Sequence, residues 1–247
     1  MSMWPYPRLV AHRGGGALAP ENTLGAIRRG AALGFKGVEF DVRLAADGTL
    51  LLIHDPTFNR TTGVGGEVAL MRYAEIAPLD AGSWMGEAWR GERVPRFEEA
   101  GQLCRELGVW ANVEIKTVAG NERAVGDAVA RAAHELWRGS ALQPVLSSSS
   151  PEALEGARAA VPELPRGLIV SRRTPPGWRE RLAALGCVAL HSNQVLLSEA
   201  LVRECHDAGH AVLAWTVNEP ADARRLLDWG VDCLVTDALE RIGPDFG

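Results

Sequence analysis

Seven side chains of this sequence could perform acid–base and electrostatic chemistry if the fold brought them together. Glu39 and Asp41 are two residues apart, and Glu114 and Lys116 repeat that spacing. Because side chains alternate along a β-strand, residues two apart point to the same face. In chain order, the seven residues are His12, Arg13, Glu39, Asp41, His54, Glu114 and Lys116.

The three carboxylates favour a metal site. Glu39, Asp41 and Glu114, at the ends of neighbouring strands and without cysteine or a histidine cluster, would form an oxygen site for a hard cation. We therefore expect one divalent cation as cofactor, Mg²⁺ or Ca²⁺. The alternative interpretation is a buried carboxylate that Arg13 or Lys116 neutralises without any metal.

His12 and His54 flank these groups and could transfer protons. A pKa near about 6.5 lets one imidazole accept a proton while another donates one, and such transfer typically contributes about 10²–10⁴-fold in rate. We expect His12 to remove the proton of the nucleophile and His54 to protonate the leaving group, with the reverse order left open. The alternative is that both rings only orient the carboxylates.

Other residues suit an anionic substrate. Arg13 and Lys116 supply positive charge, and the glycine run 14–16 exposes backbone N–H groups before a helix, which suits a phosphate. Trp215 ends a predicted strand and could wall the substrate, or simply pack. His191 ends another strand and is a further contact candidate.

Short β-like runs alternate with amphipathic helical runs, which indicates a parallel sheet covered by helices. Strands are expected at 8–12, 38–42, 109–116, 144–148, 167–171, 187–191, 211–217 and 231–236. Helices are expected from Asn22, as the N-cap, to Gly34, and at 97–107, 122–137, 152–161, 177–185, 198–208 and 221–229. We interpret Asn218 and Asp237 as caps of a helix and a turn.

A ninth β-like run, residues 49–54, follows the second strand too closely for a parallel crossover, and an Asp-Gly pair between them is a hairpin turn signal. We therefore expect residues 42–53 to form a hairpin arm with its turn at 45–48, which places Glu39 opposite His54. The eight remaining strands predict a TIM (β/α)₈ barrel whose active site lies at the C-terminal ends of the strands.

Residues 56–95 interrupt the alternation and are rich in glycine and tryptophan. We expect this segment to be an insertion within a single domain, 1–247, that covers the active-site face as a lid or substrate wall. Trp84 and Trp89 could line the mouth of the site or staple the loop.

Composition narrows the class of protein. The 247 residues are 47% hydrophobic and 23% charged, with a net charge of −5, which argues against a nucleic-acid or anionic-membrane surface. The four scattered cysteines form no CxxC pair and suit a reducing compartment. Without a signal-peptide pattern or an 18-residue apolar run, the sequence predicts a cytoplasmic protein with no stable membrane association.

The motifs, taken together, resemble those of the glycerophosphodiester phosphodiesterases. They are His12-Arg13-Gly14, Pro20-Glu21-Asn22-Thr23, Glu39-x-Asp41, Asp47-Gly48, His54-Asp55, Glu114-x-Lys116 and Trp215-Thr216-Val217-Asn218. The resemblance covers nearly the whole chain and includes the insertion, in Thr61-Thr62-Gly63 and in residues 79–84.

The resemblance implies a TIM barrel that cleaves glycerophosphodiesters to sn-glycerol 3-phosphate and an alcohol with a divalent cation. It makes His12 and His54 the acid–base pair, and Arg13 and Lys116 phosphate contacts. Glu39, Asp41 and Glu114 become metal ligands. Two alternatives stay open: a phospholipase D-like enzyme acting on lysophospholipids, and a non-catalytic phosphate-ligand sensor on the same barrel.

Overall fold

The computed structural model describes residues 4–246, so residues 1–3 and 247 of the expected domain lie outside the described part. Within it, nine strands form one sheet, and eight of them are parallel. The barrel closes because β1 pairs with both β9 and β2, which confirms the predicted TIM barrel. The parallel strands are β1 (Leu9–Ala11), β2 (Gly37–Leu44), β4 (Trp110–Ile115), β5 (Val145–Ser148), β6 (Arg166–Val170), β7 (Ala189–Asn193), β8 (Ala211–Trp215) and β9 (Cys233–Thr236).

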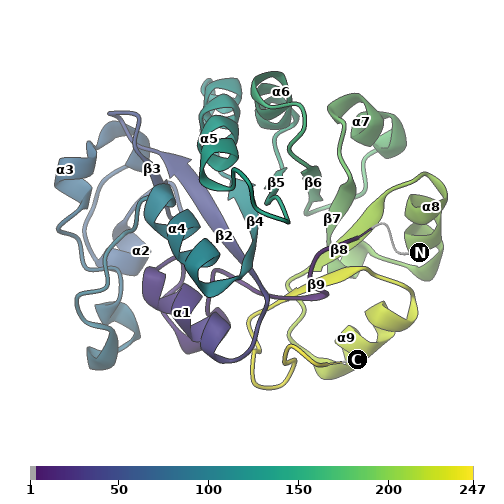
Figure 1. The fold of residues 1–247 in the computed structure, drawn as a ribbon, viewed down its shortest axis with the longest axis horizontal. Helices are drawn as coiled ribbons and strands as arrows, with labels where there is room; N and C mark the ends of the chain where they lie inside the picture. The colour runs from purple at the N-terminus through teal and green to yellow at the C-terminus, as the bar shows by residue number, and fades with distance from the viewer. Residues whose placement is uncertain (1–3, 247) are drawn as a thin grey trace.

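Helices surround these strands (Figure 1). They are α1 (Leu24–Ala32), α4 (Phe97–Leu107), α5 (Glu122–Leu136), α6 (Pro151–Ala160), α7 (Trp178–Leu185), α8 (Glu199–Asp207) and α9 (Pro220–Asp228). Two predicted N-caps were wrong. Thr23, not Asn22, is the N-cap of α1, and its hydroxyl accepts a hydrogen bond from the N–H of Ala26. Glu219, not Asn218, is the N-cap of α9. Asn22 instead adopts a left-handed conformation with φ of 58°, which turns its side chain toward the barrel.

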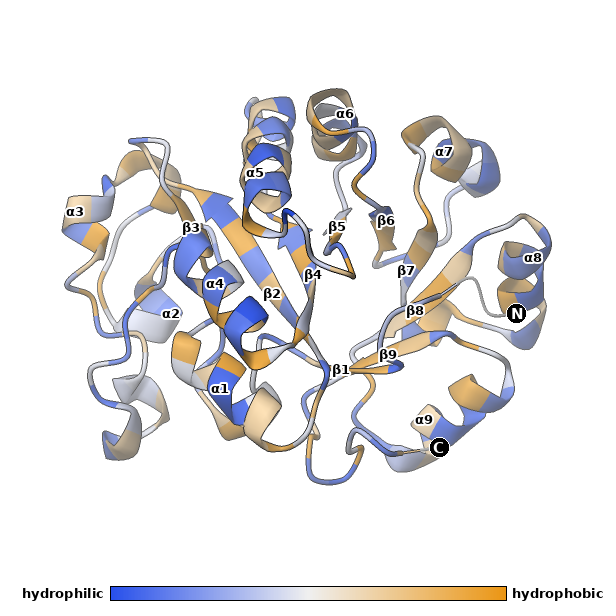
Figure 2. Ribbon diagram, viewed as in Figure 1, coloured by the Kyte–Doolittle hydropathy of each residue, from blue (hydrophilic) through white to orange (hydrophobic). Residues whose placement is uncertain are grey.

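Strand β2 shows why the barrel has two separate cores. Its residues alternate between hydrophobic and hydrophilic (Figure 2), yet nearly all are buried. Val38 and Phe40 point outward into the core shared with the helices, whereas Glu39 and Asp41 line the cavity at the barrel mouth. A second core, which includes Trp4, Val10, Trp110 and Val145, fills the barrel interior.

The hairpin arm forms as expected, but its register differs by one residue. Strand β3 (Leu50–Leu52) is antiparallel to β2 and pairs Leu44 with Leu50. The N–H of Ala45 donates to the carbonyl oxygen of Thr49, so the loop between these two residues has three residues, 46–48. The φ of 86° at Gly48 suits this loop, a turn type that ends in a left-handed residue. The predicted placement of Glu39 opposite His54 is therefore wrong.

Residues 56–95 pack beside the barrel rather than within it, and Figure 1 shows their short helices α2 (Asn59–Thr62) and α3 (Tyr73–Ile76) next to β3. A third apolar cluster, including Phe58, Val68 and Ile76, joins the segment to the outer side of the hairpin. Among the described residues, no helix has the length and apolar character needed to cross a membrane.

Candidate active site

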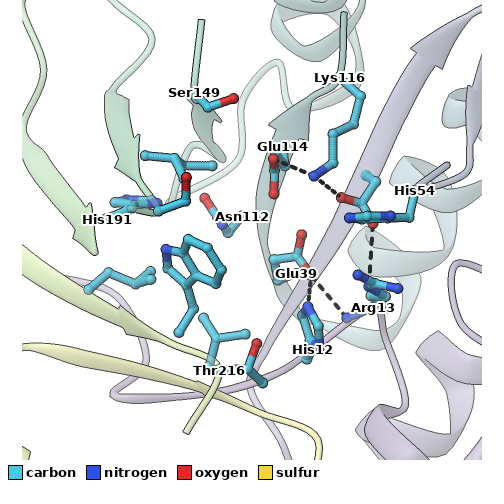
Figure 3. A pocket seen from close by; sticks show the side chains of 16 residues that line it. His12, Arg13, Glu39, His54, Asn112, Glu114, Lys116, Ser149, His191 and Thr216 are labelled. Carbon is cyan, nitrogen blue, oxygen red and sulfur yellow. Dashed lines mark hydrogen bonds and ion pairs between the residues drawn. The ribbon is translucent and has the colours of Figure 1, made fainter. Parts of the chain in front are cut away.

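A cavity of about 260 Å³ opens at the C-terminal ends of the strands. Figure 3 shows the side chains that line it. They come from strands β2, β4, β6, β7, β8 and β9 and from the segments that follow β1, the hairpin arm and several of the other strands. All eight predicted site residues line this single cavity: His12, Arg13, Glu39, Asp41, His54, Glu114, Lys116 and Trp215. The seven polar or charged residues that the sequence grouped by type and spacing are therefore brought together.

The three carboxylates converge. Glu39, Asp41 and Glu114 each offer an oxygen, and these oxygens lie within 4.8 Å of one another. Asp41 pairs directly with Glu114 across the β2–β4 ladder, so parallel strand register is what brings them together. Three clustered carboxylate oxygens match the ligand preference of a hard divalent cation.

The pKa values of two of these buried acids are shifted in opposite directions, because their charged neighbours differ. Burial, together with the charge of Asp41, raises the pKa of Glu39 to about 8. Burial also acts on Asp41, but the charge of Lys116 and other nearby cations outweighs it and lowers the pKa of Asp41 to about 2. Neighbouring carboxylates repel one another and cannot all ionise together. A cation bound between them would reduce that repulsion.

Two cations lie beside the carboxylates. The Nζ of Lys116 is 2.5 Å from Glu114 and 3.2 Å from Asp41, and the Nη1 of Arg13 is 2.7 Å from Glu21. Arg13 has a left-handed φ of 50°, and its backbone N–H donates to Glu39 at 3.0 Å. Lys116 thus partly neutralises the acidic cluster, as the metal-free interpretation expected, but the N–H of Arg13 also orients Glu39.

His12 is held by residues at the ends of β8 and β9. Its Nδ1 lies 2.6 Å from Asp237, and the side-chain amide of Asn218 donates to the other oxygen of that carboxylate at 3.0 Å. The Nε2 of His12 lies 3.9 Å from Glu39. Burial opposes protonation, but the hydrogen bond to Asp237 and the negative charges of Glu39 and Asp237 together outweigh it, and the pKa of His12 is raised.

His54 has a different support. Its Nδ1 lies 2.8 Å from Asp55, and the second oxygen of Asp55 accepts from the Nε of Arg60 at 2.7 Å. Burial lowers the pKa of His54. In both histidines a carboxylate holds Nδ1, which leaves Nε2 as the ring nitrogen available for proton exchange with a ligand.

The glycine run has a packing role. The N–H groups of Gly14 and Gly16 donate to Ala11 and His12, so the expectation that these two bind phosphate is wrong. A Cβ at Gly16 would lie 2.5 Å from the carbonyl oxygen of Asp237. Glycine is therefore needed here because two chain segments approach closely beneath His12.

The four remaining candidates fall into two groups, one at the cavity and one in the insertion. Trp215 and His191 line the cavity, and burial lowers the pKa of His191 to about 3, so this ring is neutral. Trp84 donates its indole N–H to Ala81 within the insertion, and Trp89 packs near Gly25. Among the described residues that line the cavity, none belongs to residues 56–95, so closure of the insertion over the mouth stays a prediction.

Several residues at the site were missed or interpreted only as caps. Asn218 donates to one oxygen of Asp237, and the other oxygen of Asp237 contacts His12. The rule that residues after barrel strands face the site could have identified Asp237. Asn22 donates to Asp41 at 2.8 Å; its signal was the Pro-Glu-Asn-Thr motif. Arg60 contacts Glu21 and Asp55 and had no signal of its own.

The chain matches a known protein family over nearly its whole length. The family model described as the glycerophosphoryl diester phosphodiesterase family matches residues 12–241. A glycerophosphodiester phosphodiesterase of Caldanaerobacter subterraneus subsp. tengcongensis is 32% identical over 234 residues, covering 95% of each chain. One of Bacillus subtilis is 29% identical, over 92% of this chain and 82% of its own.

Solved structures agree. A phosphodiesterase of Oleispira antarctica, in complex with the product sn-glycerol 3-phosphate, superposes with a TM-score of 0.89 at 34% identity. The superposition covers 96% of this chain and 95% of that one. A glycerophosphodiester phosphodiesterase of Agrobacterium tumefaciens has a TM-score of 0.78 at 26% identity, covering 95% of this chain and 98% of its own.

Proposed function

This chain belongs to the glycerophosphoryl diester phosphodiesterase family, and from that premise we propose that it hydrolyses glycerophosphodiesters to sn-glycerol 3-phosphate and an alcohol by metal-dependent histidine acid–base catalysis. One observation carries the proposal: two carboxylate-bound imidazoles and three convergent carboxylates line the same cavity. A reaction at phosphorus needs both proton transfer and charge neutralisation, and these groups provide both.

Glu39, Asp41 and Glu114 would hold the cation, Mg²⁺ or Ca²⁺. The fit rests on their donor atoms, which are all oxygens within 4.8 Å of one another, and on the raised pKa of Glu39, caused first by burial and then by the charge of Asp41. When bound, the cation would neutralise negative charge on the phosphate.

The chain's own cations would bind the phosphate. Arg13 and Lys116 both line the cavity, and each already has a carboxylate partner that fixes its position. A guanidinium and an ammonium placed before the substrate arrives need no reorganisation when negative charge develops on the phosphoryl oxygens. Trp215, at the cavity wall, would contact the organic part of the substrate.

The two imidazoles would divide the proton transfers. One removes the proton of the nucleophile and the other protonates the oxygen of the departing alcohol. Asp237 raises the pKa of His12 against the opposing effect of burial, whereas burial lowers the pKa of His54. The contrast favours His12 as the proton donor and His54 as the acceptor, the reverse of the order expected first from the sequence.

The decisive experiment measures release of glycerol 3-phosphate from a series of diesters that differ in the alcohol. We expect turnover of glycerophosphocholine, loss of turnover with EDTA, and recovery when Mg²⁺ or Ca²⁺ is added. Faster cleavage of lysophosphatidylcholine would instead indicate the phospholipase D-like activity. Binding of the diester in calorimetry without product would indicate a sensor, and activity that EDTA leaves unchanged would remove the metal from the proposal.

We also place the enzyme in the cytoplasm, acting on a small soluble diester. All four cysteines are free and buried, which suits a reducing compartment. The net charge of −5 is unfavourable for nucleic acid or an anionic membrane surface.

A further inference from the structure

Arg60 lies outside the barrel, on the short helix α2 of the insertion, yet it is bonded to Asp55 and Glu21, each of which contacts a side chain that lines the cavity. We propose that Arg60 is a positioning residue, which sets the orientation of His54 through Asp55 and of Arg13 through Glu21. The inference rests on the proposed function, because it assigns a purpose to the orientation of two groups in that reaction.

The contacts of Arg60 use all three nitrogens of its guanidinium. Nη1 and Nη2 donate to the two oxygens of Glu21 at 2.6 and 2.7 Å, and Nε donates to Asp55 at 2.7 Å. A planar group with donors on two edges can hold two carboxylates in one fixed relation, which a lysine ammonium cannot do. The two carboxylates therefore cannot rotate independently.

Each carboxylate uses its other hydrogen-bonding capacity toward the cavity. Asp55 contacts the Nδ1 of His54 at 2.8 Å, and Glu21 accepts from the Nη1 of Arg13 at 2.7 Å. The carboxylate of Asp55 can only accept, so it selects the tautomer of His54 with the proton on Nδ1. One guanidinium thus determines both the tautomer of a ring and the direction of a cation at the cavity wall.

Stability alone does not explain this arrangement. The Arg60 side chain is 44% exposed, and exposed ion pairs contribute little to the free energy of unfolding. The backbone of His54 is held independently, because Arg43, a β2 residue, donates to the His54 carbonyl oxygen from Nε and Nη2. Removing Arg60 would therefore free two side chains while leaving the local backbone in place.

The test compares Arg60→Gln and Arg60→Lys with a matched control, Arg90→Gln. Arg90 is also an exposed arginine of the insertion paired with a carboxylate, that of Glu87. Neither Arg60 nor Arg90 lines the cavity, but the carboxylate partners of Arg60 contact His54 and Arg13, which do. We expect kcat for glycerophosphocholine to fall about 10²-fold in Arg60→Gln, the loss that a displacement of about 1 Å causes, with the thermal midpoint close to that of the wild type. Arg60→Lys should lose less, and Arg90→Gln should match the wild type in both measurements.

A chemical rescue separates positioning from folding. In Arg60→Ala, added guanidinium chloride should restore part of kcat, while an equal concentration of sodium chloride should not, and neither salt should raise the kcat of the wild type. Glu21→Gln weakens the paired hydrogen bonds between Arg60 and residue 21 but keeps the guanidinium. It gives a second variant if Arg60→Gln does not fold. Its kcat should fall while its thermal midpoint stays near that of the wild type.

Each outcome decides between the two proposals. A wild-type protein without diesterase activity would overturn the proposed function itself. An active wild type with unchanged kcat in both Arg60→Gln and Glu21→Gln would overturn only the role of Arg60. Parallel loss of kcat and thermal midpoint, with no rescue by guanidinium, would make Arg60 a structural residue and overturn the inference equally.

Discussion

The two histidines of the site are alike in chemistry but are held by different parts of the molecule. His12 is fixed by Asp237, which accepts in turn from Asn218, and both of these residues follow barrel strands. His54 is fixed by Asp55, whose other oxygen accepts a hydrogen bond from Arg60 of the insertion. The side chain of His12 is 18% exposed and that of His54 is 34% exposed.

The half of the site that contains His12 is therefore supported by the barrel itself, whereas the half that contains His54 is supported by the insertion. The insertion has its own apolar cluster with the hairpin, distinct from the two barrel cores. A shift of the insertion would therefore reach His54 and Arg13 through Arg60 but leave His12 in place. Strand ends are precise supports for catalytic groups, and loops are adjustable ones.

The largest effects should come from removing each ring. We expect His12→Ala and His54→Ala each to lose about 10²–10⁴-fold in kcat on glycerophosphocholine, the usual contribution of a positioned acid or base. The two variants should differ on a glycerophosphodiester with a nitrophenol leaving group, which needs no protonation to depart. His12→Ala should recover most of its loss on that substrate and His54→Ala should not, because we assign proton donation to His12.

Steady-state kinetics on both substrates, at matched pH and cation concentration, provide the measurement. Circular dichroism of the two variants serves as the control for folding. Recovery by His54→Ala alone would reverse the assignment of donor and acceptor. Full activity of either variant on glycerophosphocholine would remove that ring from the mechanism.

The carboxylates behind the rings should rank next. Asp237→Asn keeps the shape but loses a charge that raises the pKa of His12. Carboxylates that support metal-bound imidazoles in the same way typically contribute about 10–100-fold, and we take that range for Asp237. We expect Asp237→Asn to fall at the upper end of that range in kcat. Asp55→Asn should fall at the lower end, because water can replace part of the support of the more exposed His54.

The pH–rate profile checks the same pair. The raised pKa of His12 depends on the charge of Asp237, so the Asp237→Asn profile should show the corresponding limb at lower pH. Asp55→Asn should shift a limb less. Equal losses and equal profiles in the two variants would mean that the two halves of the site are not supported differently.

Much of the fold was predictable because it rests on local patterns. The alternation along β2 predicted a strand, and the amphipathic runs predicted helices where α4 and α5 lie. Their order along the chain predicted the eight-stranded barrel. Spacing alone placed Glu39 and Asp41 on one face. The hairpin register was not predictable in this way. The register depends on the left-handed conformation of Gly48, which lengthens the loop by one residue. The sequence pattern alone does not show this extra loop residue.

The site was predictable in its groups but not in their supports. His12 and Asp237 are 225 positions apart in sequence, and Arg60 is 39 positions from Glu21. Such contacts depend on barrel closure and on how the insertion packs, and no periodicity encodes either. Asn22 shows the same limit, since an asparagine before a helix resembles a cap until its φ angle turns it toward Asp41.

A smaller effect should appear in the pH dependence of cation binding. Burial and Asp41 raise the pKa of Glu39 to about 8, against about 4.3 for an unfolded chain. Between these values the folded, cation-free protein holds a proton that the unfolded chain has released, so its free energy of unfolding falls as pH rises. A divalent cation competes with that proton, so cation affinity should rise with pH up to about 8.

Calorimetric titration of Mg²⁺ or Ca²⁺ at neutral pH, in two buffers that differ in ionisation enthalpy, measures the proton released. We expect release in the wild type and none from this position in Glu39→Gln, which should also bind the cation more weakly. Heat that does not depend on the buffer would show that Glu39 is already ionised before the cation binds.

The smallest effect should separate stability from chemistry on the barrel side of the site. Thr23→Ala removes the N-cap of α1, in which the hydroxyl accepts from Ala26 and donates to Pro20, and such caps contribute about 1 kcal/mol. Urea denaturation should show that loss with an unchanged slope. Because Thr23 does not line the cavity, kcat on glycerophosphocholine should stay at the wild-type value. A marked fall in kcat would mean that the start of α1 also positions the loop bearing Arg13, and that the barrel half of the site is less rigid than its strand-end supports imply.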